Sequence, residues 1–187
     1  MSKISILSAL ISLSLLFSSC TKEKEVVEEE ANTILSTNEY VLTGLDNKQY
    51  VVKKEANGYV VDGAKGKVII LDIFATWCPP CKAEASHLTS LQNKYKDNLL
   101  ILGLTIEDGI PNEKLQEFRK NYDANYVLVN SSENRRLIES VATELKVGRS
   151  FGIPLMAMYK DAKLVNYYQG ATEEEFIESD IKKALGK

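Results

Sequence analysis

The stretch Val68–Glu84, VIILDIFATWCPPCKAE, decides the fold of this chain. Its first seven residues, Val68–Phe74, are almost continuously apolar and β-branched, as expected for a central strand that is covered on both faces. From Cys78 onward, apolar side chains recur every three or four residues, which predicts an amphipathic helix. The sequence therefore places two cysteines where a buried strand meets a helix. The apolar positions of this helix are Cys81, Ala85, Leu88, Leu91 and Tyr95.

Strands and helices continue on both sides of this stretch. Leu99–Ile106 reads as a second buried strand, and a strand, helix and strand in this order predict a right-handed parallel unit. Asn57-Gly58 favours a tight turn and predicts an N-terminal β-hairpin. The pattern predicts one α/β domain over residues 40–187, with a central mixed sheet flanked by helices. The other predicted elements are hairpin strands at Tyr50–Val52 and Tyr59–Val61, strands at Tyr126–Val129, Leu155–Tyr159 and Lys163–Tyr168, and helices at Glu113–Tyr122, Glu133–Leu145 and Glu173–Leu185.

Composition and charge exclude several classes of protein. The chain has 187 residues, of which 44% are hydrophobic and 26% charged, values typical of a globular protein. Lys and Arg number 23 against 26 Asp and Glu, so the formal net charge is −3 and we expect no nucleic-acid partner. Three cysteines are too few for a disulfide scaffold. Cysteine in this chain therefore predicts chemistry or processing.

The N-terminal residues carry the features of an export signal. The apolar run Ile4–Phe17 is shorter than the roughly 20 residues of a membrane-spanning helix but suits a secretory signal. Ser18-Ser19-Cys20 then resembles the processing site of bacterial lipoproteins, in which the cysteine is lipidated and becomes the new N-terminus. We expect a signal peptide over residues 1–19, a lipid anchor on Cys20 and a charged tether over 20–39. An ordinary cleaved signal, with Cys20 free or lost, is the alternative.

The Cys78-Pro79-Pro80-Cys81 motif predicts thiol chemistry. Unpaired N–H groups and the helix dipole at a helix N-terminus stabilise a thiolate, so Cys78 is the expected nucleophile. Cys81 lies three residues later on the same helical face, within reach of a mixed disulfide at Cys78. Pro79 and Pro80 fix φ and organise the first helical turn.

The cysteine pair has two alternative uses. A zinc site needs four ligands, but the chain has no second CxxC and its one histidine, His87, lies on the same predicted helix, so we expect no metal. A purely structural disulfide stays open as an alternative. His87 itself is expected to be a surface or packing residue. No nicotinamide or flavin motif is present, so no cofactor is predicted.

The run Phe74–Glu84, preceded by Gly66-Lys67, resembles the TlpA/ResA family of extracytoplasmic thiol-disulfide oxidoreductases in the thioredoxin superfamily. The resemblance covers about Tyr40–Lys187 and implies a thioredoxin-like fold with a family-type insertion over residues 107–149. It also implies a cis bond between Ile153 and Pro154, with the backbone before this proline meeting the substrate beside the disulfide.

Three further residues receive roles from their positions. Asp72 matches the buried aspartate of thioredoxin and is predicted to be a base or proton store for Cys81; a solvent-facing strand residue is the alternative. Glu84 matches the active-site glutamate of ResA-like proteins, with an exposed helix residue as the alternative. Trp77 is expected to shield the disulfide and contact partners, or simply to pack.

The sequence therefore predicts a membrane-anchored, extracytoplasmic reductase, periplasmic if its source has two membranes. The resemblance implies disulfide-bearing exported proteins as partners, with apocytochrome c as a possible client, and a membrane thiol reductase of the DsbD/CcdA type as electron donor. The alternatives are a disulfide oxidase or isomerase and a non-catalytic lipoprotein that binds partners. A thiol peroxidase is less favoured, because the motif lacks a separate peroxidatic cysteine.

Overall fold

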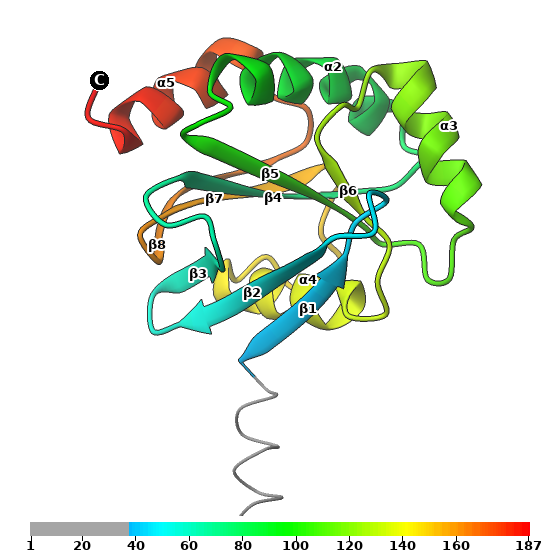
Figure 1. Cartoon of the computed structure of the whole chain (residues 1–187), viewed down its shortest axis with the longest axis horizontal. Helices are drawn as coiled ribbons and strands as arrows, with labels where there is room; N and C mark the ends of the chain where they lie inside the picture. The colour runs from blue at the N-terminus through cyan, green and yellow to red at the C-terminus, as the bar shows by residue number, and fades with distance from the viewer. Residues whose placement is uncertain (1–37) are drawn as a thin grey trace, which may run out of the picture. The chain divides into compact units, whose positions relative to one another are not determined.

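A five-stranded mixed sheet forms the centre of the protein (Figure 1). The computed structural model describes residues 38–187, so the predicted signal peptide and Cys20 lie outside the described residues. Strand β4 is parallel to β5 and antiparallel to β7, which confirms the predicted central mixed sheet. The strands lie in the order β6 (Val127–Val129), β5 (Leu99–Thr105), β4 (Val68–Phe74), β7 (Leu155–Lys160) and β8 (Lys163–Gln169).

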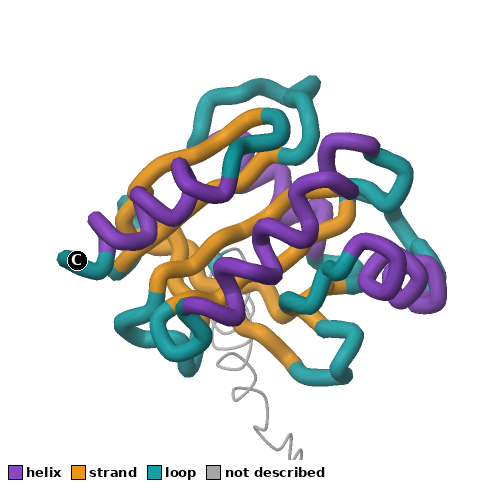
Figure 2. Tube along the Cα trace, turned by 90° about the horizontal axis from the view of Figure 1, so that it is seen from above, coloured by secondary structure: helices purple, strands orange, loops and turns teal. Residues whose placement is uncertain are grey.

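Three helices cover one face of this sheet. Helices α2 (Pro79–Lys94), α3 (Asn112–Tyr122) and α5 (Glu174–Ala184) share a hydrophobic core with the central strands. Figure 2 shows α2 and α5 crossing the strands on the same side. Core side chains on these helices, including Leu88, Phe118 and Ile177, are buried because the apolar stripe of each helix faces the sheet.

A second, smaller sheet and one helix cover the opposite face. Strands β1 (Glu39–Thr43), β2 (Gln49–Glu55) and β3 (Gly58–Val61) form an antiparallel sheet, and α4 (Asn134–Glu144) packs in the same core. The predicted hairpin is confirmed as β2 and β3, but β1 is a third strand that the sequence analysis did not predict. Its burial alternates along the strand, as in a strand with one face toward a core.

The predicted insertion contributes to both faces of the protein. Residues 107–149 contain α3, the edge strand β6 and α4, so this segment completes the central sheet and covers both of its faces. None of the helices within residues 38–187 is long and apolar enough to cross a membrane.

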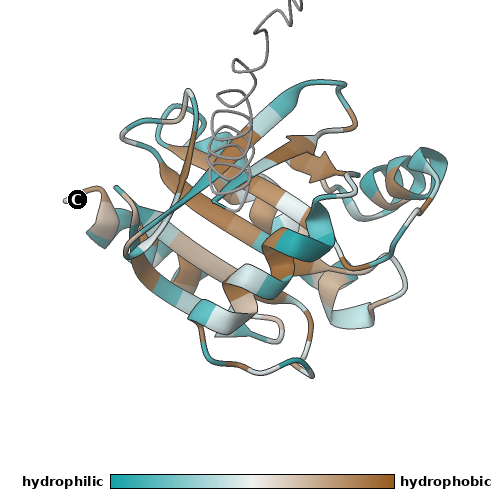
Figure 3. Ribbon diagram, turned by 90° about the horizontal axis from the view of Figure 1, so that it is seen from below, coloured by the Kyte–Doolittle hydropathy of each residue, from teal (hydrophilic) through white to brown (hydrophobic). Residues whose placement is uncertain are grey.

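Strand β4 has apolar neighbours on both faces, and its alternation decides which side chains face which core. Ile69, Leu71 and Ile73 point to the core with β1–β3, whereas Ile70 and Phe74 point to the core with α2. Asp72 shares the side of Ile70 and Phe74, because side chains alternate along a strand. Figure 3 shows the hydrophobic colour of the central strands.

Candidate active site

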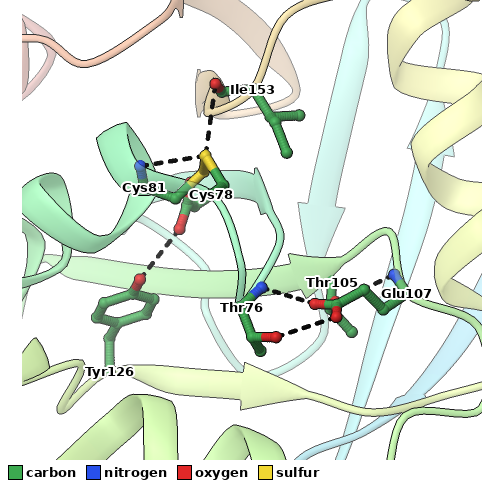
Figure 4. The surroundings of a disulfide bond; sticks show 8 residues. Thr76, Cys78, Cys81, Thr105, Glu107, Tyr126 and Ile153 are labelled. Carbon is green, nitrogen blue, oxygen red and sulfur yellow. Dashed lines mark hydrogen bonds between the residues drawn. A yellow bond between two sulfur atoms is a disulfide. The ribbon is translucent and has the colours of Figure 1, made fainter. Parts of the chain in front are cut away.

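The cysteine pair lies at the predicted junction between β4 and α2 (Figure 4). Cys78 is the N-cap of α2 and is joined to Cys81 by a disulfide with a Cα–Cα distance of 5.3 Å. The backbone N–H of Cys81 donates to Sγ of Cys78 at 3.3 Å. Pro79 and Pro80 occupy the first helical positions, where the amide groups would have no partner inside the helix. The structure thus gives Cys78 the backbone environment that stabilises a thiolate.

The side chains around the disulfide differ strongly in exposure. Cys78 and Cys81 are only 2% and 3% exposed, whereas Trp77 is 61% exposed. Pro79 and Pro80 are also exposed. The alternative that Trp77 simply packs is therefore wrong. An exposed indole beside the sulfur atoms offers apolar contact area to a partner protein.

The loop before β7 reaches the disulfide from another part of the chain. The peptide bond between Ile153 and Pro154 is cis, which confirms the expectation. The carbonyl oxygen of Ile153 lies 3.7 Å from Sγ of Cys78, and Figure 4 shows it directed at this sulfur. Pro154 is buried and Ile153 is partly exposed, so the backbone at Ile153 borders the disulfide.

Asp72 is buried beneath α2 in the middle of β4. It is 2% exposed, so the alternative of a solvent-facing strand residue is wrong. Its Oδ2 accepts a hydrogen bond from the Tyr126 hydroxyl at 3.1 Å, and its Oδ1 is buried with no hydrogen-bond partner among residues 38–187. Burial raises the pKa of Asp72 to about 7, while the hydrogen bond from Tyr126 opposes this rise.

Glu84, one turn after Cys81, is a second buried carboxyl group with a single hydrogen-bonded oxygen. It is also 2% exposed, so the alternative of an exposed helix residue is wrong. Its Oε1 accepts from the backbone N–H of Thr172 at 2.9 Å, and its Oε2 has no partner within the described part of the chain. Burial first, and then the charge of Asp72, raise the pKa of Glu84 to about 8. The two carboxyl groups therefore interact electrostatically and can hold protons near neutral pH.

A third carboxyl group, Glu107, holds the loop before the cysteines. Its Oε2 accepts from the backbone N–H of Thr76 at 2.6 Å, and its Oε1 accepts from the Thr76 hydroxyl at 3.0 Å. Thr105 donates to the same carboxylate at 3.2 Å and accepts from the N–H of Glu107 at 3.1 Å. Figure 4 shows this group joining the ends of β4 and β5.

Three polar partners of the site were not predicted: Tyr126, Thr172 and Glu107. Tyr126 and Thr172 lie 54 and 88 residues from the carboxylates that they contact, and no local spacing reveals such a pair. For Glu107 the sequence holds one indication of a role, because this residue directly follows the predicted strand Leu99–Ile106. Within residues 38–187 no cluster of three or more His, Cys, Asp or Glu side chains could hold a metal ion.

Proteins with known chemistry resemble this chain. ResA, a thiol-disulfide oxidoreductase of Bacillus thuringiensis subsp. konkukian, is 26% identical over 149 residues, which are 77% of this chain and 73% of ResA. The thioredoxin-like protein YneN of Bacillus subtilis is 33% identical over 67 residues, which are 35% of this chain but only 39% of YneN. The crystal structure of a thiol:disulfide interchange protein from Chlorobium tepidum superposes with a TM-score of 0.63 at 20% identity, covering 80% of this chain and 94% of that one.

Fold, disulfide and relatives together define a thiol-disulfide oxidoreductase of the thioredoxin fold, similar to ResA. The redox-active pair is Cys78 and Cys81. The chain belongs to the Redoxin family, whose model matches residues 45–185.

Proposed function

We propose that this protein reduces disulfide bonds in exported proteins. In the proposed cycle, the Cys78 thiolate attacks a client disulfide and one client sulfur leaves as a thiolate. Cys81 then attacks Sγ of Cys78, and the second client sulfur leaves with the electron pair of the broken bond. The client has gained two electrons, and the protein is left with the Cys78–Cys81 disulfide.

The position of Cys78 supports its role as the attacking sulfur. As N-cap of α2, it receives the hydrogen bond of the Cys81 N–H and lies at the positive end of the helix dipole. Cys81 lies three residues later, almost one turn along the same helix, which places its sulfur within reach of Sγ of Cys78 once a client is bound there.

The two buried carboxyl groups carry the proposal that the reaction runs as a reduction. Asp72 and Glu84 face the core beneath the cysteines, and neither forms an ion pair with a basic side chain among the described residues. Where either carboxyl group is ionised, its negative charge in a dry environment opposes a further negative charge on sulfur, so these groups disfavour the dithiolate form. A reduced form that is poorly stabilised gives up its electrons readily, as expected of a reductant.

Asp72 and Glu84 also supply a place for the proton of Cys81. Each has one carboxyl oxygen held by a hydrogen bond and one buried oxygen that finds no partner among residues 38–187. We infer that one of these unpartnered oxygens accepts the Cys81 proton when the client is released.

The surface around the disulfide supports binding of an extended client segment. Trp77, Pro79 and Pro80 offer exposed apolar area on one side, and the backbone of Ile153 before Pro154 borders Cys78 on the other. Such a surface would recognise the backbone and shape of a client more than its sequence, which suits a reductase of unfolded exported proteins.

The proposed cellular location and partner proteins follow from the sequence and the resemblance. Cys20 would carry the lipid anchor, the acidic tether would hold the domain outside the cytoplasmic membrane, and a membrane thiol reductase would return electrons to the disulfide. Apocytochrome c is the proposed client by analogy with the family. Incorporation of labelled fatty acid that is lost in Cys20→Ala tests the anchor separately.

The reduction potential tests the direction of the reaction. We expect the Cys78–Cys81 couple to equilibrate with a glutathione or dithiothreitol buffer at a potential well below about −200 mV. A value near −120 mV, like that of a strong oxidant, would refute the reductive role. Trapping with Cys81→Ala, which leaves the mixed disulfide on Cys78, then captures the client.

A disulfide oxidase or isomerase is the second candidate, and one observation favours it. The N-cap position of Cys78 stabilises its thiolate, which on its own makes the disulfide more oxidising. The same potential measurement separates the two, because the helix N-terminus and the buried carboxyls act in opposite directions.

A further inference from the structure

Tyr126 reaches the buried aspartate across an intervening strand. Tyr126 directly precedes β6 at one edge of the sheet, and Asp72 lies in β4, with β5 between them. The residue of β5 that pairs with Asp72 is Gly103. The side chain of Tyr126 therefore crosses a strand at its glycine before its hydroxyl reaches Oδ2 of Asp72 at 3.1 Å.

The missing side chain of Gly103 makes room for the tyrosine ring. A Cβ atom at this position would lie 2.9 Å from Cε2 of Tyr126 and 3.0 Å from Cδ2 of Leu128, which is closer than such atoms pack. The backbone of Gly103 is not in the left-handed region, so its conformation alone does not demand glycine. Glycine is needed at this position because the Tyr126 ring occupies the space of a side chain.

The hydrogen bond leaves the two oxygens of Asp72 in different situations. Oδ2 is occupied by the Tyr126 hydroxyl, and Oδ1 is buried without a partner within the described chain. Tyr126 is itself 5% exposed, so water does not readily take the place of its hydroxyl. One oxygen is thus fixed while the other is available for a proton.

We propose that Tyr126 is a positioning residue for the Cys81 step: it holds Asp72 through Oδ2 so that Oδ1 takes the proton of Cys81, and Gly103 exists to let it reach. The inference rests on the proposed function, because it concerns the release of the client. In this step the proton moves from Sγ of Cys81 to Oδ1 of Asp72. The resulting thiolate forms the bond to Cys78, and the client sulfur leaves.

The groups that face Asp72 determine the direction of the expected effect. The N-cap and first turns of α2 contribute Cys78, Cys81 and Glu84, and the residue directly before β6 is Tyr126. From the neighbouring strands, Gly103 of β5 and Met156 of β7 pair with Asp72 and carry no charge. Glu84 opposes the ionised form of Asp72, and the hydroxyl donor of Tyr126 favours it.

The test follows the two thiol steps separately in the reduced full-length chain. Mixed with dithionitrobenzoate, Cys78 releases a first thionitrobenzoate and Cys81 a second, so stopped-flow absorbance between pH 5 and 9 gives each rate. In Tyr126→Phe we expect the pH midpoint of the second step to rise by about one pH unit, and its rate on the acid side to fall about tenfold. The first step should not change.

Gly103→Ala provides an independent variant that keeps the hydroxyl. The added methyl group displaces the ring, so its second step should shift in the same direction as that of Tyr126→Phe. The double variant should shift no further than Tyr126→Phe alone, because both changes break the same contact. Tyr59→Phe is the matched control: its buried hydroxyl bonds Ser140 at 2.7 Å on the opposite face of the sheet. It should leave both steps unchanged.

Second-step profiles of Tyr126→Phe that superimpose on the wild type would overturn the inference. If Tyr126→Phe does not fold, an unshifted profile in Gly103→Ala overturns it instead. Infrared absorption of the protonated Asp72 carboxyl, assigned by its loss in Asp72→Asn, gives a readout that does not need reactive cysteines. Its midpoint should also rise when the hydroxyl is removed. A wild-type chain with no first step would refute the proposed function, whereas the infrared titration would still decide the role of Tyr126.

Discussion

The two faces of strand β4 have opposite character, although they belong to the same seven residues. Toward β1–β3 and α4 the strand presents only Ile69, Leu71 and Ile73. Toward α2 it presents apolar side chains and one carboxyl group, Asp72, in an equally buried position. One face follows the packing rule for a central strand without exception, and the other breaks it at a single residue.

This difference shows where the protein gives up stability for chemistry. A buried carboxyl group with an unpartnered oxygen costs free energy, and the α2 face contains two of them, Asp72 and Glu84. Both lie next to the redox-active disulfide, while the core on the opposite face has no buried Asp or Glu among residues 38–187. Substitutions on the α2 face should therefore change activity, and substitutions on the opposite face should change stability.

The largest effect should come from the nucleophile. Cys78→Ser should lower the reduction of insulin disulfides to the background rate, because the proposed cycle starts with attack by the Cys78 thiolate. Insulin turbidity with dithiothreitol as electron source measures this. Tyr59→Phe on the opposite face should retain the wild-type rate. Full activity in Cys78→Ser would refute Cys78 as the nucleophile, whereas a wild-type rate no higher than the background would favour a binding role.

On the opposite face, Leu71→Ala should affect stability alone. Removal of a fully buried leucine side chain typically costs about 2–5 kcal/mol, so we expect the free energy of unfolding of the variant to fall by about this amount. Urea unfolding measures the loss. The reduction potential should not move, since Leu71 points away from the disulfide; a clear change in potential would contradict the separation of the two faces.

Asp72→Asn should do the reverse and stabilise the protein at alkaline pH. The pKa of Asp72 rises from its ordinary value of 3.8 to about 7 on folding, so the native state binds more protons than the unfolded state between these values. The free energy of unfolding of the wild type therefore falls as pH rises through this window. Asparagine removes the penalty and should add roughly 2–4 kcal/mol above pH 7 and little below pH 4.

The same substitution should slow the release of the client. Without a carboxylate to take the Cys81 proton, resolution of the mixed disulfide should slow more than its formation, and Glu84→Gln should act in the same direction. Urea unfolding at pH 4 and pH 8, with stopped-flow kinetics, measures both effects. Equal stability gains at the two pH values, or unchanged kinetics in both steps, would remove Asp72 from the proposed mechanism.

Much of the fold followed from the sequence because its central elements have strong local patterns. The run Val68–Phe74 is too apolar and too β-branched for a surface element, and the helix after Cys78 has a clear apolar stripe. Strand β1 was missed because it is short, lies at the edge of its sheet and exposes Val41, so its alternation is weak.

The site was predictable where the chain itself brings residues together. Cys78, Cys81 and Glu84 share one helix face, and Asp72 ends up beneath them because strand and helix are consecutive. Tyr126 and Thr172 could not be predicted, since each depends on packing between distant segments. The gap at Gly103 is visible only once strand register is known.

The carboxylate of Glu107 has one more consequence. Its hydrogen bonds to Thr76 and Thr105 involve no sulfur atom, so we expect them to persist when the disulfide opens and closes. The Glu107 carboxylate would then hold the backbone before Trp77 against the end of β5 in both oxidation states. We therefore expect the client and the electron donor to bind the same docking surface in turn. The client meets it with the cysteines reduced, and the donor meets it with the disulfide closed.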